Sequence, residues 1–317
     1  MAGDVPQNPG ELPMIAYLRH DQIDKTRWDD CIAQAVNGNV YAWSWYLDLV
    51  HPGWGALVEM KDDNYLSVMP LTGNRKYGIH YLFQPFFVQQ LGVFSREELS
   101  PGKVGSFLEA IPKKFRLIQI RLNEGNEVPD RFRGVEHHCN HLLDLRLEYS
   151  KLSSDYHENT RRNLKKSLNH GLRLLKAVPM ERVIALFREN RGASIRHWGD
   201  AEYRRLLALS QCAVSSSKAF VYGVQTIDNE DVVCGALFLV SHQRITFLFS
   251  GNNSLGRESH AMTFLIDQVI REYAATPFTL DFEGSDDEAL GRFYSGFGSV
   301  SITYPSYSRL PWWWFKK

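Results

Sequence analysis

Patterns that hold metals or disulfides are missing from this sequence. Its 317 residues include four cysteines, with no CxxC pair and no Cys/His pair at zinc spacing: Cys31, Cys139, Cys212 and Cys234. Scattered cysteines without such spacing are typical of free thiols in a reducing compartment. We therefore expect free thiols and no metal site.

A net charge and a long apolar run are also missing. Thirty-six basic residues balance thirty-six acidic ones, so no overall field attracts the chain to nucleic acid or to an anionic membrane. Any such partner needs a local patch. No apolar run approaches the ~20 residues of a membrane helix, and the opening MAGDVPQNPGELP has neither the basic region nor the apolar core of a signal peptide. We expect a cytoplasmic protein without a membrane partner.

Length and composition predict a globular protein of two domains. Apolar residues make up 44% of the chain and charged residues 23%, as in ordinary globular proteins, and the length allows roughly two domains of ~150 residues each. The first half predicts an α+β unit. Its expected helices are 24–36, 43–50 and 102–110, and its expected strands are 14–18, 56–60, 65–70, 81–90, 117–121 and 141–144, with turns at 61–64 and 73–75.

The second half predicts a similar order of helices and strands. Its expected helices are 153–169, 180–190, 200–216 and the stretch from His260, and its expected strands are 173–177, 219–226, 232–241, 244–250 and the strand ending near Asp281. This repeat of helix, strand, helices, meander, helix and strand indicates two similar α+β domains in tandem, without a residue-level repeat.

The end of the last predicted strand is unusual. Apolar residues spaced three and four apart after His260 predict a helix with one buried face, and the strand that follows ends in Asp281, Glu283 and Gly284. Carboxylates beside a glycine at the carboxyl end of a strand occupy the position where open α/β sheets place their sites. Because side chains alternate along a strand, both carboxylates are expected on one face.

A basic stripe lies near the start of the second half. Between Thr160 and Lys176 the chain carries six basic residues and no acid: Arg161, Arg162, Lys165, Lys166, Arg173 and Lys176. Such a stripe is suited to the phosphates of a tRNA, a CoA or a nucleotide-linked substrate, and a solvated helix face is the alternative. Like charges four residues apart destabilise a helix by a few tenths of a kcal/mol, which bound anions or ion pairs with Asp281 or Glu283 would offset.

Four stretches of the sequence resemble one family. YHENTRRNLKKSLNHGL from Tyr156, the helix ending in DFEGS at Ser285, GRFYSGFGSV from Gly291 and, more weakly, YLFQPFFVQQLGVF from Tyr81 resemble the Fem-type aminoacyltransferases and acyl-CoA N-acyltransferases of the GNAT superfamily, in the FemAB-like branch. The resemblance spans about Tyr41 to Tyr304. It implies tandem GNAT-like domains, each a twisted mixed sheet flanked by helices, over 1–148 and 149–308, with residues 309–317 packing on the first domain.

The resemblance also implies a catalytic base for an attacking amine. Asp281 or Glu283 would take the amine's proton, since a carboxylate with a raised pKa suits that task. Tyr294 is a further catalytic candidate, and His197 and Trp198 are candidates for binding the substrate in the cleft. A structural role for the two carboxylates, as caps of the helix that follows or as partners of Arg161 and Arg162, stays open.

A donor site is implied at the loop from Ser250 to Met262. GNAT enzymes hold a pyrophosphate on backbone amides where a glycine-rich turn opens a helix. The predicted binding residues here are Ser250, Gly251, Gly256, Arg257 and His260. The loop lacks the QxxGxG/A spacing of acyl-CoA enzymes, a departure expected of Fem-type members, which use aminoacyl-tRNA. An ordinary turn without a ligand is the alternative.

We therefore expect an acyltransferase that moves an acyl or aminoacyl group from a thioester or ester donor, with acyl-CoA as the leading donor, to a small-molecule or peptide-like amine. An aminoacyl-tRNA-dependent ligase for a peptidoglycan precursor is an alternative, which the neutral charge and the lack of an inserted coiled-coil arm disfavour. A binding or scaffold protein without catalysis is the other alternative.

Overall fold

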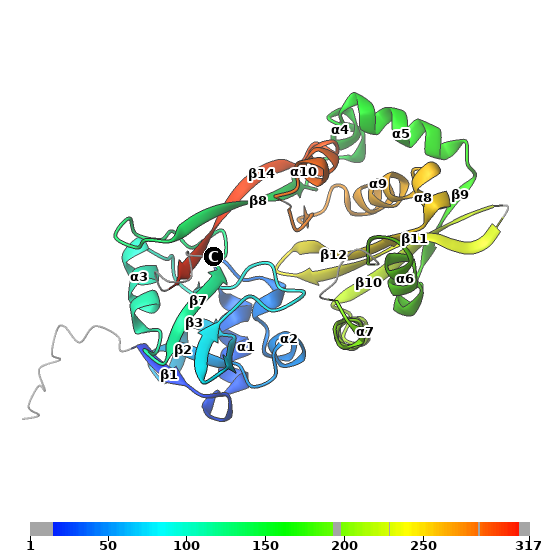
Figure 1. Ribbon diagram of the computed structural model, residues 1–317. Helices are drawn as coiled ribbons and strands as arrows, with labels where there is room; N and C mark the ends of the chain where they lie inside the picture. The colour runs from blue at the N-terminus through cyan, green and yellow to red at the C-terminus, as the bar shows by residue number, and fades with distance from the viewer. Residues whose placement is uncertain (1–14, 193–197, 228, 285, 311–317) are drawn as a thin grey trace, which may run out of the picture.

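Two lobes joined by long strands make up the protein (Figure 1). The computed structural model describes residues 15–192, 198–227, 229–284 and 286–310. The first lobe is built from the first half of the chain. Its elements are β1 (Ile15–Leu18), η1 (His20–Gln22), α1 (Lys25–Gln34), η2 (Val40–Ala42), α2 (Ser44–Val50), β2 (Gly55–Lys61), β3 (Asn64–Leu71), β4 (Gly73–Lys76), β5 (Ile79–Leu82), β6 (Phe94–Ser95), α3 (Pro101–Ala110), β7 (Phe115–Arg121) and β8 (Val135–Asp144).

The second lobe places helices on both faces of a sheet, with α9 above it and α6 and α7 below it in Figure 1. Its elements are α4 (Tyr149–Ser154), α5 (Glu158–Leu168), β9 (Leu172–Lys176), α6 (Met180–Phe187), the π-helical turn η3 (Arg188–Gly192), α7 (Asp200–Ser215), β10 (Ala219–Thr226), β11 (Asn229–Ser241), β12 (Arg244–Asn252), α8 (Ser254–Glu258), α9 (Ala261–Tyr273), β13 (Thr279–Asp281), α10 (Glu288–Ser295) and β14 (Val300–Arg309).

A ten-stranded mixed sheet passes from one lobe into the other. Its order is β4-β5-β7-β14-β8-β13-β12-β11-β10-β9, and a separate four-stranded sheet, β1-β2-β3-β6, belongs to the first lobe. One apolar core also reaches through both lobes, from Trp28 and Tyr46 to Leu206 and Leu237. The lobes therefore share both hydrogen bonds and buried surface, and the sheet continues without a break across the domain boundary predicted at residues 148 and 149.

The last strand returns to the first lobe. β14 lies between β7 and β8, pairing Val300 with Leu142 at one end and Arg309 with Ile118 at the other. No strand was predicted here, because both strands that pair with β14 lie more than a hundred residues earlier in the chain. Residues 311–317 of the predicted tail lie outside the described residues.

Three predicted elements are wrong. The strand expected over 81–90 ends with β5 at Leu82, because Pro85 has no N–H to donate and Phe87 has a left-handed φ of 63°. The turn expected at 73–75 is the strand β4, which pairs with β5 through a two-residue turn at Tyr77 and Gly78, both with positive φ.

The helix expected over 153–169 is divided into α4 and α5. The break buries Tyr156, whose hydroxyl donates to Asp267 on α9 at 3.1 Å and whose ring packs edge-on to Phe297. Burying this aromatic side chain therefore decides where the helix is interrupted.

Two glycines with the same backbone conformation test the placement of β14. Gly134 and Gly78 both have a φ of 79°, but a Cβ on Gly134 would lie 2.2 Å from the carbonyl oxygen of Ser308 in β14, whereas a Cβ on Gly78 meets nothing within 4 Å. We expect Gly78→Ala to cost about 1–2 kcal/mol of unfolding free energy, for the left-handed backbone. Gly134→Ala should cost about 1–3 kcal/mol more, as overpacking does. Urea titrations measure both, and equal losses would contradict the strand order.

Candidate active site

A cavity forms where two neighbouring parallel strands separate. β12 and β13 pair in parallel only over three residues, from Arg244 with Thr279 to Thr246 with Asp281. Beyond that point β12 continues to Asn252, while the chain leaves β13 for α10. The gap lies at the carboxyl ends of both strands, which is where open α/β sheets bind ligands.

A bulge in β12 turns successive side chains toward this gap. Leu237 of β11 pairs with Phe249, but the next residue, Phe238, pairs with Phe247, so Leu248 is an extra residue on β12. A regular strand sends alternate side chains to opposite faces, and a bulge interrupts that alternation. Phe247, Leu248 and Phe249 all line the cavity as a result.

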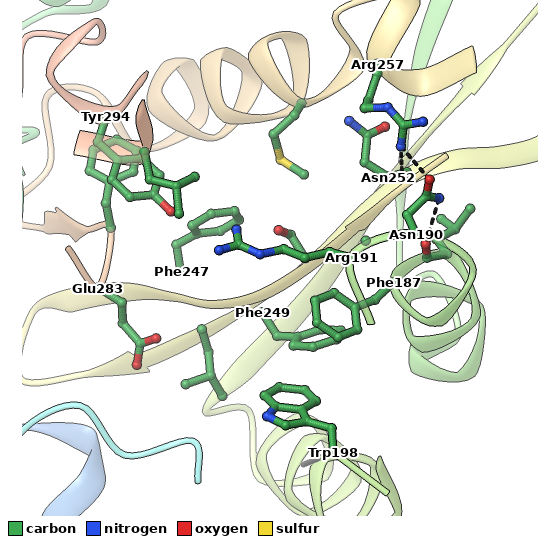
Figure 2. A pocket seen from close by; sticks show the side chains of 17 residues that line it. Phe187, Asn190, Arg191, Trp198, Phe247, Phe249, Asn252, Arg257, Glu283 and Tyr294 are labelled. Atoms are coloured by element: carbon green, nitrogen blue, oxygen red, sulfur yellow. Dashed lines mark hydrogen bonds between the residues drawn. The ribbon is translucent and has the colours of Figure 1, made fainter. Parts of the chain in front are cut away.

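The site cavity has a volume of about 590 Å³ and a mixed lining. Apolar side chains from α6, β12, α9 and α10 form most of its wall, and Figure 2 shows Arg191 extending between Phe247 and Phe249. Glu283 and Tyr294 come from the opposite side. An apolar wall with a few convergent polar groups is the usual form of a small-molecule site.

Glu283 points its carboxylate at this cavity from a strained backbone. Its φ of 53° is left-handed, so the chain turns sharply just after β13 and the alternation expected between Asp281 and Glu283 does not extend to Glu283. The hydroxyl of Tyr41, from the first lobe, donates to Glu283 Oε1. The site is therefore completed by a residue 242 positions away in the sequence.

Asp281 is held beneath Glu283 rather than in the cavity. It is 2% exposed and accepts hydrogen bonds from Asn140 Nδ2 at 3.0 Å, from the Glu283 N–H at 2.8 Å and from Arg244 Nη1 at 3.1 Å. Arg244 also pairs with Glu124 of the first lobe. The ion-pair partner of Asp281 is thus Arg244, not Arg161 or Arg162, and the cap of α10 is Asp287.

Burial raises the pKa of Glu283 well above its usual range. The Asp281 charge adds to that rise, while the Tyr41 hydrogen bond and the charge of Arg121 oppose it. Burial raises the pKa of Asp281 as well, against the charge of Arg244. A carboxyl that faces a cavity and has a raised pKa is suited to general acid or base chemistry near neutral pH.

Tyr294 faces Glu283 across one end of the cavity. Its ring stacks on Phe282 at 5.0 Å between centroids, and burial raises its pKa to about 12. Its hydroxyl is therefore protonated at neutral pH and can donate a hydrogen bond. Trp198, also predicted, lies in the cavity wall and contacts Phe249, whereas the predicted His197 lies outside the described residues.

The predicted donor loop contributes unequally to the cavity. Ser250, Gly251 and Arg257 line it, and Gly251 also lets α6 approach, since a Cβ there would lie 2.3 Å from the Val183 oxygen. The N–H of Gly256 is used by the Asn253 cap of α8. His260 caps α9 with a left-handed φ of 55°. Neither Gly256 nor His260 lines the cavity.

Two polar groups in the cavity wall beside α8, on Arg257 and Asn252, are suited to an extended acyl donor such as acyl-CoA. Arg257 is held by Asn190 Oδ1 at 2.6 Å, as the dashed lines in Figure 2 show, and carries a positive charge at the cavity wall. Asn252 Oδ1 is buried at the same wall and has no hydrogen-bond partner among the described residues. An arginine for an anion and an acceptor for an amide N–H fit such a donor.

The basic helix stands apart from the cavity. Arg161, Arg162 and Lys165 are exposed on α5, and none of them lines the cavity. Arg161 donates to the Ser154 carbonyl at 3.1 Å and Arg162 to Asn159 Oδ1 at 2.7 Å. Any role they have in binding phosphate is therefore at the surface of the second lobe.

Several polar residues of the site were not among the predicted ones: Tyr41, Asn190, Arg191, Arg244 and Asn252. Arg244 begins a largely apolar strand, and an arginine in that position indicates a buried acidic partner. Tyr41 gives no local signal, because its partner belongs to the other lobe.

The described residues contain no group of three or more His, Cys, Asp or Glu side chains able to hold a metal ion. Within the same part of the chain, no helix combines the length and apolarity needed to cross a bilayer.

No protein-family model and no curated protein sequence matches this chain. Solved structures do share its fold. FemX superposes with a TM-score of 0.62 at 12% identity, covering 89% of this chain and 96% of FemX. The C-terminal domain of a putative lysylphosphatidylglycerol synthetase from Agrobacterium fabrum gives 0.56 at 12% identity, covering 91% and 92%. A tandem GNAT protein from the clavulanic acid biosynthesis pathway gives 0.51 at 10% identity, covering 94% and 99%.

These likenesses confirm the predicted fold, a FemAB-like arrangement of tandem GNAT-type domains with a mixed sheet flanked by helices. At 10–12% identity they establish the fold alone.

The raised pKa of Glu283 predicts a pH-dependent stability. The folded protein binds this proton more tightly than the unfolded chain does, so the stabilisation is complete below the ordinary glutamate pKa of about 4.3 and is lost as the pH rises toward the folded-state pKa. We expect Glu283→Gln, a neutral isostere, to become progressively more stable than the wild type as the pH rises above the ordinary glutamate pKa of about 4.3. Urea midpoints across this range measure the difference. The exposed control Glu98→Gln should show no such trend, and a constant difference for Glu283→Gln would contradict the assignment.

Proposed function

We propose that this protein is an acyltransferase that moves an acyl or aminoacyl group from a thioester or ester donor to an amine. The observation that carries the proposal is Glu283, a carboxyl with a raised pKa that faces a cavity at the separation of β12 and β13. The shared fold with FemX and a tandem GNAT protein supports the same class of reaction.

The proposed reaction is R–CO–X + H₂N–R′ → R–CO–NH–R′ + HX, where X is the sulfur or oxygen of the donor. Glu283, in its ionised form, takes a proton from the attacking nitrogen as the new C–N bond forms. The Tyr294 hydroxyl, which is protonated at neutral pH, gives a proton to X as the C–X bond breaks. Solvent at the open cavity returns the proton from Glu283 to Tyr294.

The remaining residues hold the reactants and the base in place. Tyr41 fixes one carboxylate oxygen of Glu283 and leaves the other toward the cavity. Arg257 and Arg191 place positive charge beside the donor end, with Arg257 on α8 and Arg191 in η3. Trp198, Phe187 and Phe249 supply an apolar wall for the acyl group. An acyl-CoA would supply the activated thioester, which these residues would bind and shield from water.

The exposed basic face of α5 favours one specific alternative donor, an aminoacyl-tRNA. Arg161, Arg162 and Lys165 stand in solvent, where the phosphates of a large nucleic acid can reach them. Binding through these residues would weaken steeply with added salt, because counterions are released on binding.

A donor screen followed by a transfer assay tests the proposal. Thermal or denaturant shifts with acetyl-CoA, a longer acyl-CoA and aminoacyl-tRNA should identify one donor, since a ligand at 100 times its dissociation constant adds ~2.7 kcal/mol. With that donor, Glu283→Gln should lower kcat by roughly 10²–10⁴-fold, the usual contribution of a general base.

The exposed Glu98→Gln serves as the matched control and should keep wild-type activity. Transfer that survives in Glu283→Gln would remove this residue from the mechanism. A flat response to every donor would favour a scaffold protein that has the fold without the chemistry.

A further inference from the structure

A second cavity, of about 430 Å³, adjoins the site cavity where the two lobes meet. The two cavities share Trp198, Leu248, Phe249 and Glu283, so Glu283 can be approached from two directions. The second cavity also takes residues from the first lobe, Arg121 among them. With the donor in the first cavity, the acceptor has this second route to the same carboxylate.

Arg121 lines the second cavity, and hydrogen bonds hold its backbone in place. It ends β7, where its N–H donates to Gln84 Oε1 at 3.0 Å and its carbonyl accepts from the Leu91 N–H at 3.0 Å. Its side chain is half-buried, yet the guanidinium makes no hydrogen bond or ion pair with any residue that the structure describes. A half-buried guanidinium on a hydrogen-bonded backbone, without a side-chain partner of its own among the described residues, is available to a ligand.

The acidic groups described around Arg121 form hydrogen bonds with other residues and none with its guanidinium, which therefore stays available to a ligand. Asp286 accepts from His138 Nδ1 at 2.8 Å and from the Cys139 N–H at 3.4 Å, and Asp287 accepts from the first N–H groups of α10. Burial raises the pKa of Glu283 and of Tyr304, and the Arg121 charge partly offsets that rise in both. The guanidinium thus influences the cavity through its charge without being paired.

The balance of charge limits which ligand fits. Three carboxyl groups, on Glu283, Asp286 and Asp287, face the same cavity as the single arginine. A doubly charged phosphate would be repelled by these acids. A zwitterion complements both the negative and the positive charges of this cavity, with its amine toward the acids and its single negative charge toward Arg121.

We propose that the second cavity binds acceptor amines that carry a carboxylate, with the carboxylate on the Arg121 guanidinium and the amine directed at Glu283. This deepens the proposed function and rests on it for the role of Glu283. The planar guanidinium matches a carboxylate with two parallel hydrogen bonds, which favours this group over a neutral amide. Free amino acids and peptide termini share this chemistry.

Binding measurements with matched amines test the proposal without requiring turnover. Calorimetric or NMR titrations would compare β-alanine and L-alanyl-L-alanine with propylamine and 2-aminoethylphosphonate. The wild type should bind one or both carboxylate probes at least ~10-fold more tightly than propylamine, as expected for a hydrogen-bonded charge pair. The dipeptide and β-alanine distinguish a peptide terminus from a free amino acid as the source of the carboxylate.

Variants of two arginines on the same strand complete the test. Arg121→Met should abolish the preference for carboxylate probes, and Arg121→Lys should keep part of it. Arg116→Met, an exposed position on β7, should leave it unchanged. The proposal is overturned if the wild type binds propylamine equally well, if it binds no amine, if the phosphonate binds most tightly, or if Arg121→Met keeps the preference.

The same titrations separate this inference from the proposed function. A carboxylate preference that depends on Arg121, found in a protein that transfers from no donor, would retain the acceptor site and reject the acyl transfer. Transfer to amines with no dependence on their carboxylate, and no effect of Arg121→Met on it, would retain the reaction and reject the acceptor site.

Discussion

The buried carboxylate of Asp281 is the constraint around which the two lobes meet. At 2% exposure its charge costs several kcal/mol unless it is paired and hydrogen-bonded. Arg244 supplies the charge and is itself held by Glu124 of the first lobe, while Asn140 donates from β8. One buried charge therefore connects β8 and Glu124 of the first lobe with β12 and β13 of the second, beneath the point where β12 and β13 separate.

This constraint also positions Glu283. Asp281 accepts the Glu283 N–H at 2.8 Å, which stabilises the left-handed turn at the end of β13. The turn directs the Glu283 side chain into the space between the lobes, where Tyr41 donates to it. Asp281, which was predicted to act beside Glu283, thus holds the backbone of Glu283 in position. Asp281 and Glu283 are two residues apart but have different surroundings. Asp281 is paired with Arg244, and Glu283 faces two cavities.

The features of this fold that depend on neighbouring residues can be predicted from the sequence, and those that depend on distant segments cannot. The spacing of apolar residues places α9 and β12, and the acids after an apolar strand indicate the site, because each signal lies within a few residues. β14 pairs with strands more than a hundred residues earlier, and Tyr41 reaches Glu283 across 242 positions. The bulge at Leu248 arises from the pairing of β12 with β11, and the spacing of residues within β12 does not predict it. Such features depend on contacts between distant segments.

Tyr41 holds the Glu283 carboxyl, whose pKa is raised by burial, between the two lobes. An infrared titration that subtracts the Glu283→Gln spectrum from that of the wild type measures the protonation of this carboxyl directly. It should titrate well above the ordinary glutamate pKa, and higher still in Tyr41→Phe, because the hydrogen bond from Tyr41 favours the ionised form. A carboxyl that titrates near 4.3, about the value of an exposed glutamate, and does not respond to Tyr41→Phe would contradict a buried Glu283 held by Tyr41.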